Sequence, residues 1–212
     1  ARPVDAHPYR SPQAIHTRLL PHFVGKDVVE FGTRNGDGIC CFAFVARTAL
    51  AIEPEPQLCE ALKKRSQSLK EATGSSFGVK CARFQETALN RADVFTWWFG
   101  GLGLDAIALQ HLRKLHASRK LRPNASAVVL FEGGSAEDEA SFKVLRGRAS
   151  WAENIAFNET ELCLERFRSK RWLCMRAAGS YHVLGFRIAD LPRRSRDPDT
   201  RVSRETLLQR EK

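Results

Sequence analysis

Short apolar runs alternate with helix-like stretches over the first two thirds of the chain, and this alternation is the feature that most constrains the fold. The stretch 56–72, for example, opens with proline and repeats apolar residues at helical spacing. Strands and helices in this order favour a mostly parallel α/β sheet with helices on both faces. The expected strands are Asp27–Gly32, Ala49–Glu53, Gly78–Phe84, Asp93–Phe99 and Ala127–Glu132, and the expected helices are 11–20, 37–49, 56–72, 104–121 and 137–146.

The last third of the chain has a different pattern. Strand-like runs at 161–167, 172–177 and 181–189 follow one another with little helix between them, which favours antiparallel strands added at one edge of the sheet. The 212 residues, 43% of them hydrophobic, are enough for one well-buried domain. We therefore expect an N-terminal arm at 1–10, a single domain at 11–190 and a basic, flexible tail at 191–212.

The net charge of +10 favours an acidic partner, such as RNA, a ribonucleoprotein or a protein complex. A generally basic protein of the mitochondrial matrix would have the same composition, so both interpretations stay open. The six cysteines show no C-x-x-C pair and no metal-like spacing, and most lie among apolar neighbours. We expect reduced cysteines, no metal site, no transmembrane segment and an intracellular location, either cytoplasmic or mitochondrial.

The loop after the first expected strand, in "VVEFGTRNG", combines an acid with glycines. Glycine allows positive φ and a close approach of the backbone to a ligand. A phosphate-binding P-loop requires Gly-Lys-Ser/Thr, which is absent, and the dinucleotide pattern fails because Cys41 stands where its third glycine belongs. The second expected strand ends in Glu53, a position from which a carboxylate can accept hydrogen bonds from ribose hydroxyls.

Glu30, Gly32 and Gly36, followed by Glu53 in "IEPEPQLCEAL", resemble the first motif and the later acid of class I (seven-strand) S-adenosylmethionine-dependent methyltransferases. The resemblance implies a three-layer Rossmann-like methyltransferase fold with a mostly parallel sheet and antiparallel C-terminal strands. It also implies S-adenosylmethionine as the cofactor and a substrate pocket beyond the fourth and fifth strands. The implied cofactor-binding residues are Glu30, Gly32, Thr33, Arg34, Gly36, Glu53 and Glu86 (with Gln85 as the alternative to Glu86), and the pocket candidates are Trp97, Trp98 and Glu132.

Arg34 replaces the middle glycine of the family's loop, and the Asn/Asp-Pro-Pro-Tyr/Phe motif of some relatives is absent. The implied activity is methyl transfer to an acceptor that the sequence does not identify, with no catalytic base assigned. The alternative is a catalytically inactive, methyltransferase-like subunit of a larger complex, possibly organellar; an NAD-type oxidoreductase is a third reading. Each site residue also has a structural reading: the glycines shape a turn, Glu53 caps a helix, and one of the two tryptophans lies in the core.

Overall fold

The computed structural model describes residues 13–89, 92–98, 102–132, 136–157 and 179–191. They form one seven-stranded sheet of order β3-β2-β1-β4-β5-β7-β6. Strands β3, β2, β1, β4 and β5 run parallel to one another, whereas β7 runs antiparallel to both β5 and β6. The elements in chain order are α1 (Gln13–Leu19), β1 (Asp27–Phe31), α2 (Asp37–Phe42), β2 (Thr48–Ile52), α3 (Pro56–Thr73), β3 (Gly78–Lys80), β4 (Val94–Trp98), α4 (Leu102–Ala117), β5 (Ser126–Glu132), α5 (Ala136–Arg146), β6 (Trp151–Phe157) and β7 (Gly179–Arg187).

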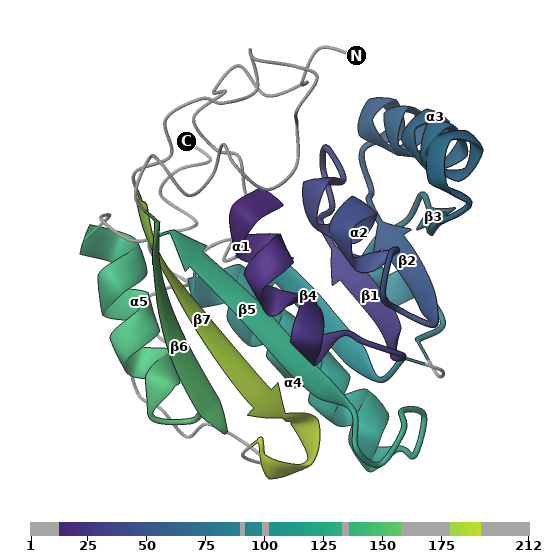
Figure 1. The fold of residues 1–212 in the computed structure, drawn as a ribbon. Helices are drawn as coiled ribbons and strands as arrows, with labels where there is room; N and C mark the ends of the chain where they lie inside the picture. The colour runs from purple at the N-terminus through teal and green to yellow at the C-terminus, as the bar shows by residue number, and fades with distance from the viewer. Residues whose placement is uncertain (1–12, 90–91, 99–101, 133–135, 158–178, 192–212) are drawn as a thin grey trace, which may run out of the picture.

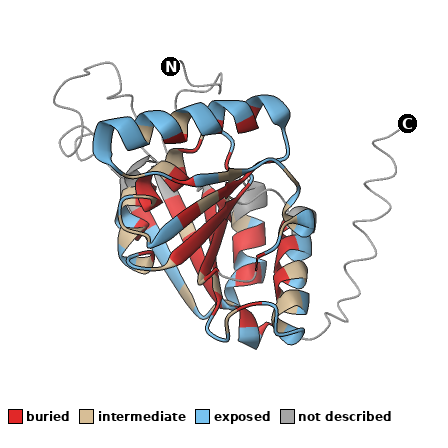
Figure 2. Cartoon of the chain, turned by 90° about the vertical axis from the view of Figure 1, so that its right-hand side faces the viewer, coloured by how far each residue is buried: buried red, intermediate tan, exposed pale blue. Residues whose placement is uncertain are grey.

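Helices cover the two faces of the sheet, with α1 in front of it and α4 behind it in the view of Figure 1. On the α1 side, apolar residues of α1, α2 and α3 form one buried cluster with the strands. On the α4 side, residues of α4 and α5 form the second cluster. Strands β1 and β4 are buried along almost their whole length, and Figure 2 shows buried residues along the central strands, because both of their faces are covered. The predicted fold class, three layers around a mostly parallel sheet, is confirmed.

Two predicted helices end earlier in the structure. The helix predicted at 37–49 ends at Phe42, since the N–H of Arg47 donates to the Lys26 carbonyl and turns the chain into β2. The helix predicted to reach residue 121 ends at Ala117, because Arg119 adopts a left-handed φ of 56° that reverses the backbone.

The strand predictions also need correction in two places. The strand β3 stops at Lys80, because Phe84 begins a short 3-10 turn, η2 (Phe84–Glu86), instead of continuing the strand. The strand β6 was not predicted at all. The runs 161–167 and 172–177, the arm and the tail lie outside the described residues, so those predictions stay untested.

The expectation that the cysteines are reduced is wrong for one pair. Cys59 of α3 and Cys81, which follows β3, form a disulfide with a Cα–Cα distance of 5.6 Å. The two residues lie 22 positions apart in the sequence. They meet because the parallel β2–β3 pairing brings the end of β3 beside the first turns of α3.

No helix within the described part of the chain combines the length and the apolar character needed to cross a membrane.

Candidate functional site

The loop between β1 and α2 lies at the carboxyl ends of the parallel strands, where ligands bind in open α/β sheets. Its first residue, Gly32, has a φ of 59° and is joined to β2 because its N–H donates to the Ile52 carbonyl at 2.9 Å. A Cβ built on Gly32 would have no heavy atom within 4 Å. The backbone here is therefore both strained for any other residue and open on the side where a side chain would stand.

Glu30 lies beneath this loop, 4% exposed, and supports the start of α2. Its Oε2 accepts the N–H of Ile39 at 3.1 Å, and its Oε1 lies 2.1 Å from the position that a Cβ on Gly38 would take. Gly38 thus lets the carboxyl group fit against the helix backbone. Burial raises the pKa of Glu30 from 4.5 to about 8, so the side chain is mostly a neutral carboxylic acid at neutral pH.

Glu53 follows β2 directly and connects three segments of the site. Its Oε2 accepts the N–H of Arg34 at 2.9 Å, and its Oε1 accepts the N–H of Glu55 at 3.0 Å. Its own N–H donates to the Lys80 carbonyl of β3 at 3.1 Å. The carboxylate is 4% exposed, and each oxygen retains a lone pair beyond the backbone hydrogen bond that it accepts.

Arg34 adopts a left-handed conformation with a φ of 49°, in the place of the family's middle glycine. Its backbone N–H is held by Glu53, and the residue is exposed at the surface. The turn that the sequence requires here is therefore formed by an arginine without burying its side chain.

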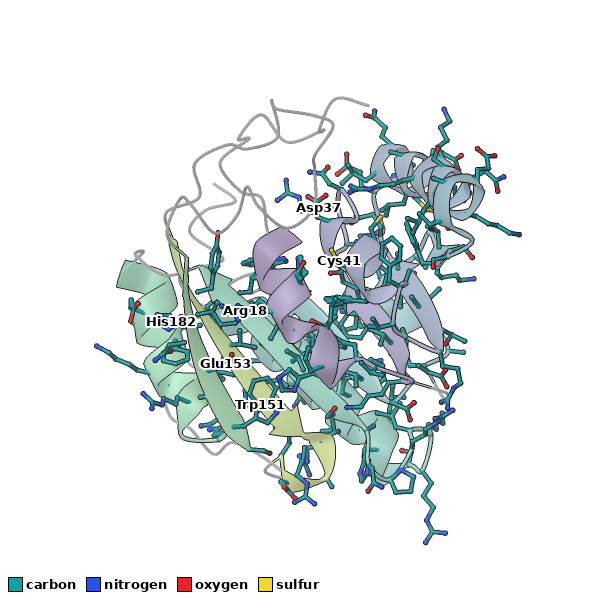
Figure 3. The ribbon with its side chains drawn as sticks, viewed as in Figure 1. Arg18, Asp37, Cys41, Trp151, Glu153 and His182 are labelled. Atoms are coloured by element: carbon teal, nitrogen blue, oxygen red, sulfur yellow. A yellow bond between two sulfur atoms is a disulfide. The ribbon has the colours of Figure 1, made fainter. Side chains whose placement is uncertain are left out.

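Gly36 has a role that differs from that of Gly32. It precedes α2 with a φ of 79°, and a Cβ on it would lie 2.6 Å from Cδ2 of Leu62. The absence of a Cβ at Gly36 thus allows the loop to pack closely against α3. Arg65 of α3 completes this junction, since its guanidinium donates to the Asn35 carbonyl and pairs with Asp37 at 2.7 Å. Asp37, labelled in Figure 3, marks the first residue of α2.

The segment after β3 contributes an aromatic surface to the site. Phe84 stacks on Phe31 of β1 with ring centroids 4.8 Å apart. Glu86 and Gln85, the two predicted adenine contacts, are both exposed in or beside η2. The structure thus brings Glu30, Gly32, Thr33, Arg34, Gly36 and Glu53 to one site, with Glu86 on the neighbouring segment.

The two tryptophans of β4 point to opposite faces of the sheet. Trp97 is 4% exposed and belongs to the core on the α4 side, where its Nε1–H donates to Asp105. This burial agrees with the structural reading in which one of the two tryptophans lies in the core, and a pocket role for Trp97 stays a prediction. Trp98 is partly exposed on the other face, between the rings of His16 and Tyr181 at centroid distances of 5.7 Å and 5.9 Å.

His16 of α1 was missed by the sequence analysis. It is 1% exposed, its Nδ1 has no hydrogen-bond partner among the residues that the structure describes, and burial lowers its pKa from 6.5 to about 3. Its Cε1 lies 2.9 Å from the position of a Cβ on Gly38, so His16 and Glu30 approach the same point of α2. No local pattern marks His16, because only the packing of α1 on α2 brings it there.

Glu132 is the last residue of β5 and pairs with Tyr181 of β7. Its backbone therefore lies at the carboxyl end of the sheet, as predicted. Its side chain lies outside the described part of the chain, so its predicted contact with substrate stays a prediction.

Comparison with known proteins gives a consistent result at the level of the fold. No family model matches the sequence, and no curated protein matches it. Solved structures do match. An RNA methyltransferase from Salinibacter ruber in complex with S-adenosyl-L-homocysteine has a TM-score of 0.53 at 14% identity, covering 87% of this chain and 95% of that one.

Two further structures agree with the first. Precorrin-6y C5,15-methyltransferase from Geobacter metallireducens has a TM-score of 0.55 at 13% identity, with 88% of this chain and 92% of that one covered. A tRNA (m1A58) methyltransferase from Aquifex aeolicus has a TM-score of 0.51 at 19% identity, with 82% and 68% covered. The chain has the class I methyltransferase fold. The strand order and the antiparallel β7 of this methyltransferase-like domain place its glycine loop at the position that the sequence resemblance implied.

Proposed function

We propose that this methyltransferase-like protein binds S-adenosylmethionine at the β1–β2 end of the sheet and transfers its methyl group to an acceptor. The observation that supports this most directly is Gly32, whose positive φ and open side face the carboxyl ends of the strands. The Salinibacter ruber structure, which shares the fold, contains S-adenosyl-L-homocysteine, the demethylated product.

The hydrogen-bonding groups around Gly32 fit such a cofactor. Lone pairs on the Glu53 carboxylate would accept hydrogen bonds from the ribose hydroxyls, and the backbone of the Gly32–Gly36 loop would hold the amino-acid end of the cofactor. The stacked rings of Phe84 and Phe31 provide an aromatic surface beside the exposed Glu86, where the adenine is expected. When bound, the cofactor supplies a methyl group activated by the positive charge of its sulfur.

The chain itself contributes orientation rather than an assigned acid or base. Glu30 and Glu53 fix the backbone of the loop through hydrogen bonds to Ile39, Arg34 and Glu55. Trp98, partly exposed at the end of β4, would form one wall of the acceptor pocket. Positioning of two reactants is enough for large rate effects in an in-line transfer. The charge of +10 supports an acidic acceptor or partner, such as RNA or a ribonucleoprotein.

A non-catalytic subunit with the same fold is the second candidate, and one observation favours it. Both oxygens of Glu53 already accept backbone N–H groups, and the side chain is 4% exposed, so this carboxylate also has a purely structural role in closing the loop. The two candidates differ in whether the protein binds the cofactor at all.

Calorimetric titration with S-adenosylmethionine and S-adenosyl-L-homocysteine tests the proposal, and the glycines offer a matched pair of variants. Gly32 and Gly25 have φ values of 59° and 67°, and a Cβ on either would have no heavy atom within 4 Å. Alanine therefore adds the same backbone strain at both positions, about 1–2 kcal/mol. We expect Gly25→Ala to bind like the wild type, and Gly32→Ala to lose at least tenfold in affinity because its methyl group occupies ligand space.

Equal affinity in both variants would place the ligand elsewhere. If neither compound binds the wild-type protein at sub-millimolar concentration, the non-catalytic candidate is favoured. If binding is found, transfer of a labelled methyl group to total RNA and to total protein, in separate reactions, would identify the class of acceptor.

A further inference from the structure

The disulfide between Cys59 and Cys81 lies beside the candidate site rather than in the centre of the core. Cys59 is completely buried in the first turns of α3, whereas Cys81 is exposed directly after β3. A dithiol in solution can therefore reach the sulfur of Cys81. Exposed disulfides are the ones that reduce readily and serve regulation.

The strand that this disulfide anchors is short and has few apolar contacts of its own. β3 has only three residues, Gly78–Lys80, it forms the edge of the sheet, and none of its residues is fully buried. Val79 is its one partly buried apolar residue. At its amino end β3 is held to α3 by the buried Phe77, whose carbonyl accepts the Ser66 hydroxyl at 2.6 Å and whose N–H donates to the same oxygen at 3.0 Å. At its carboxyl end, the position of β3 depends on its pairing with β2 and on the covalent bond to α3.

The disulfide joins the two segments that surround Glu53. On one side, the N–H of Cys59 donates to the Glu55 carbonyl at 2.9 Å, and Glu55 in turn donates its own N–H to Glu53. On the other side, Cys81 follows Lys80, whose carbonyl accepts the N–H of Glu53. Opening the bond would release the β3 side of Glu53 while leaving the α3 side in place.

We propose that the Cys59–Cys81 disulfide is a reversible redox site, and that its reduction weakens cofactor binding by freeing the β3 edge of the site. A thiolate of a dithiol reductant attacks Sγ of Cys81, and the Cys59 sulfur leaves and takes up a proton. The second thiol of the reductant then releases Cys81, so the reductant is oxidised to its own disulfide while two electrons and two protons pass to the protein.

The free thiol of Cys40 does not compete in this exchange. Burial raises its pKa to about 11, so it carries almost no thiolate at neutral pH. The exchange is thus directed to the exposed sulfur of Cys81. The effect on the cofactor rests on the proposed function, whereas the effect on β3 does not.

The first measurement needs no cofactor. The folded protein is treated with excess dithiothreitol, and peptide mass mapping with a thiol label follows Cys59 and Cys81. Hydrogen exchange then follows the amide of Glu53, which donates to the Lys80 carbonyl, and the amide of Lys80, whose N–H faces β2 in the parallel register. We expect both cysteines to become labelled and both amides to exchange at least tenfold faster, while the Gly32 amide, bonded to β2, is unchanged. A disulfide that stays closed in the folded protein, or unchanged exchange after reduction, overturns the proposal.

The second measurement compares S-adenosyl-L-homocysteine affinity in the oxidised and reduced protein. If reduction leaves the β3 edge in place in about one molecule in ten, the apparent Kd rises about tenfold. The double variant Cys59→Ser/Cys81→Ser should have the affinity of the reduced wild type, and dithiothreitol should not change that affinity. Equal affinity in both redox states overturns the link to the cofactor. Absence of binding in both states instead refutes the proposed function, and the exchange data still decide on the redox site.

Discussion

Replacing Glu30 with glutamine tests whether a neutral acid is built into the base of the site. The side chain is 4% exposed, accepts the N–H of Ile39, and lies against Gly38 so closely that a Cβ there would be 2.1 Å from Oε1. Glutamine has the same shape, and its carbonyl oxygen can accept the same N–H. The substitution therefore removes the ionisation of Glu30 and changes little else.

The sign of the effect follows from the direction of the pKa shift. The pKa of Glu30 is about 8 in the folded protein and 4.5 without the fold, because burial disfavours the carboxylate. Between these values the folded state holds a proton that the unfolded state has lost, so the stability from Glu30 falls as the pH rises. The quantity to follow is the difference in the free energy of unfolding between the wild type and Glu30→Gln. As the pH rises from about 6 to about 9, the wild type should lose about 2.5 kcal/mol relative to the variant.

Urea denaturation followed by circular dichroism at several pH values measures this difference. Subtracting the two proteins cancels every other titrating group, and a change of this size corresponds to a shift of about 5–10 °C in Tm. Glu60→Gln, at an exposed residue paired with Lys63, serves as the control and should show a flat difference over the same range. If the difference between the wild type and Glu30→Gln stays constant within about 0.5 kcal/mol over this pH range, Glu30 is not a neutral acid in the folded protein.

Three further substitutions test other parts of the fold. Asp27→Asn should lower the free energy of unfolding by about 2–3 kcal/mol without changing cofactor affinity. Arg47 lowers the pKa of Asp27 to about 2, so the stability that this carboxylate provides is present above pH 3.8 and is lost as the pH falls through about 2. His16→Phe should leave stability at neutral pH unchanged or raise it by up to about 1 kcal/mol, because it removes an unpartnered buried nitrogen. It should also lower the pH of acid unfolding, because neutral His16 contributes stability that is present above pH 6.5 and lost toward pH 3. Gly36→Ala should cost about 2 kcal/mol, and trimming Leu62 to alanine in the same chain should recover part of that loss if their close contact is the cause. Urea titrations measure all three, and an Asp27→Asn protein with wild-type stability would contradict the ion-pair argument.

The sequence predicts the parts of the site that depend on local pattern. Glu30 lies near the end of one strand, and Gly32 and the turn at Arg34 follow it directly, so their position at the carboxyl end of the sheet could be read from the order of residues. Glu53 follows the next strand in the same way. Parallel pairing of β1 with β2 then brings both strand ends together without any further information.

The features that were missed depend on contacts between distant elements. The role of Gly36 is set by Leu62 of α3, and the disulfide is set by the β2–β3 pairing. The strand β6 escaped prediction because Glu153 interrupts its apolar alternation, and an edge strand tolerates an exposed charge there. The side to which each β4 tryptophan points also required the sheet, since alternation alone does not say which face lies toward the site.

The two ends of the sheet differ in a way that explains why stability and binding can be tested separately. At the amino ends of β1 and β4, Asp27 and Asp93 pair with Arg47 and Arg122 at distances of 2.6–3.0 Å. This network ties β1 and β4 together without using any residue of the glycine loop. The carboxyl end instead contains a buried acid and three left-handed residues, Gly32, Arg34 and Gly36, which are costly features that the paired end helps to stabilise. Weakening the amino end should therefore lower the stability of the whole domain and leave cofactor affinity intact, whereas Gly32→Ala should lower cofactor affinity. A protein in which Asp27→Asn lowered affinity as strongly as Gly32→Ala would show that the two ends are coupled and that this separation is wrong.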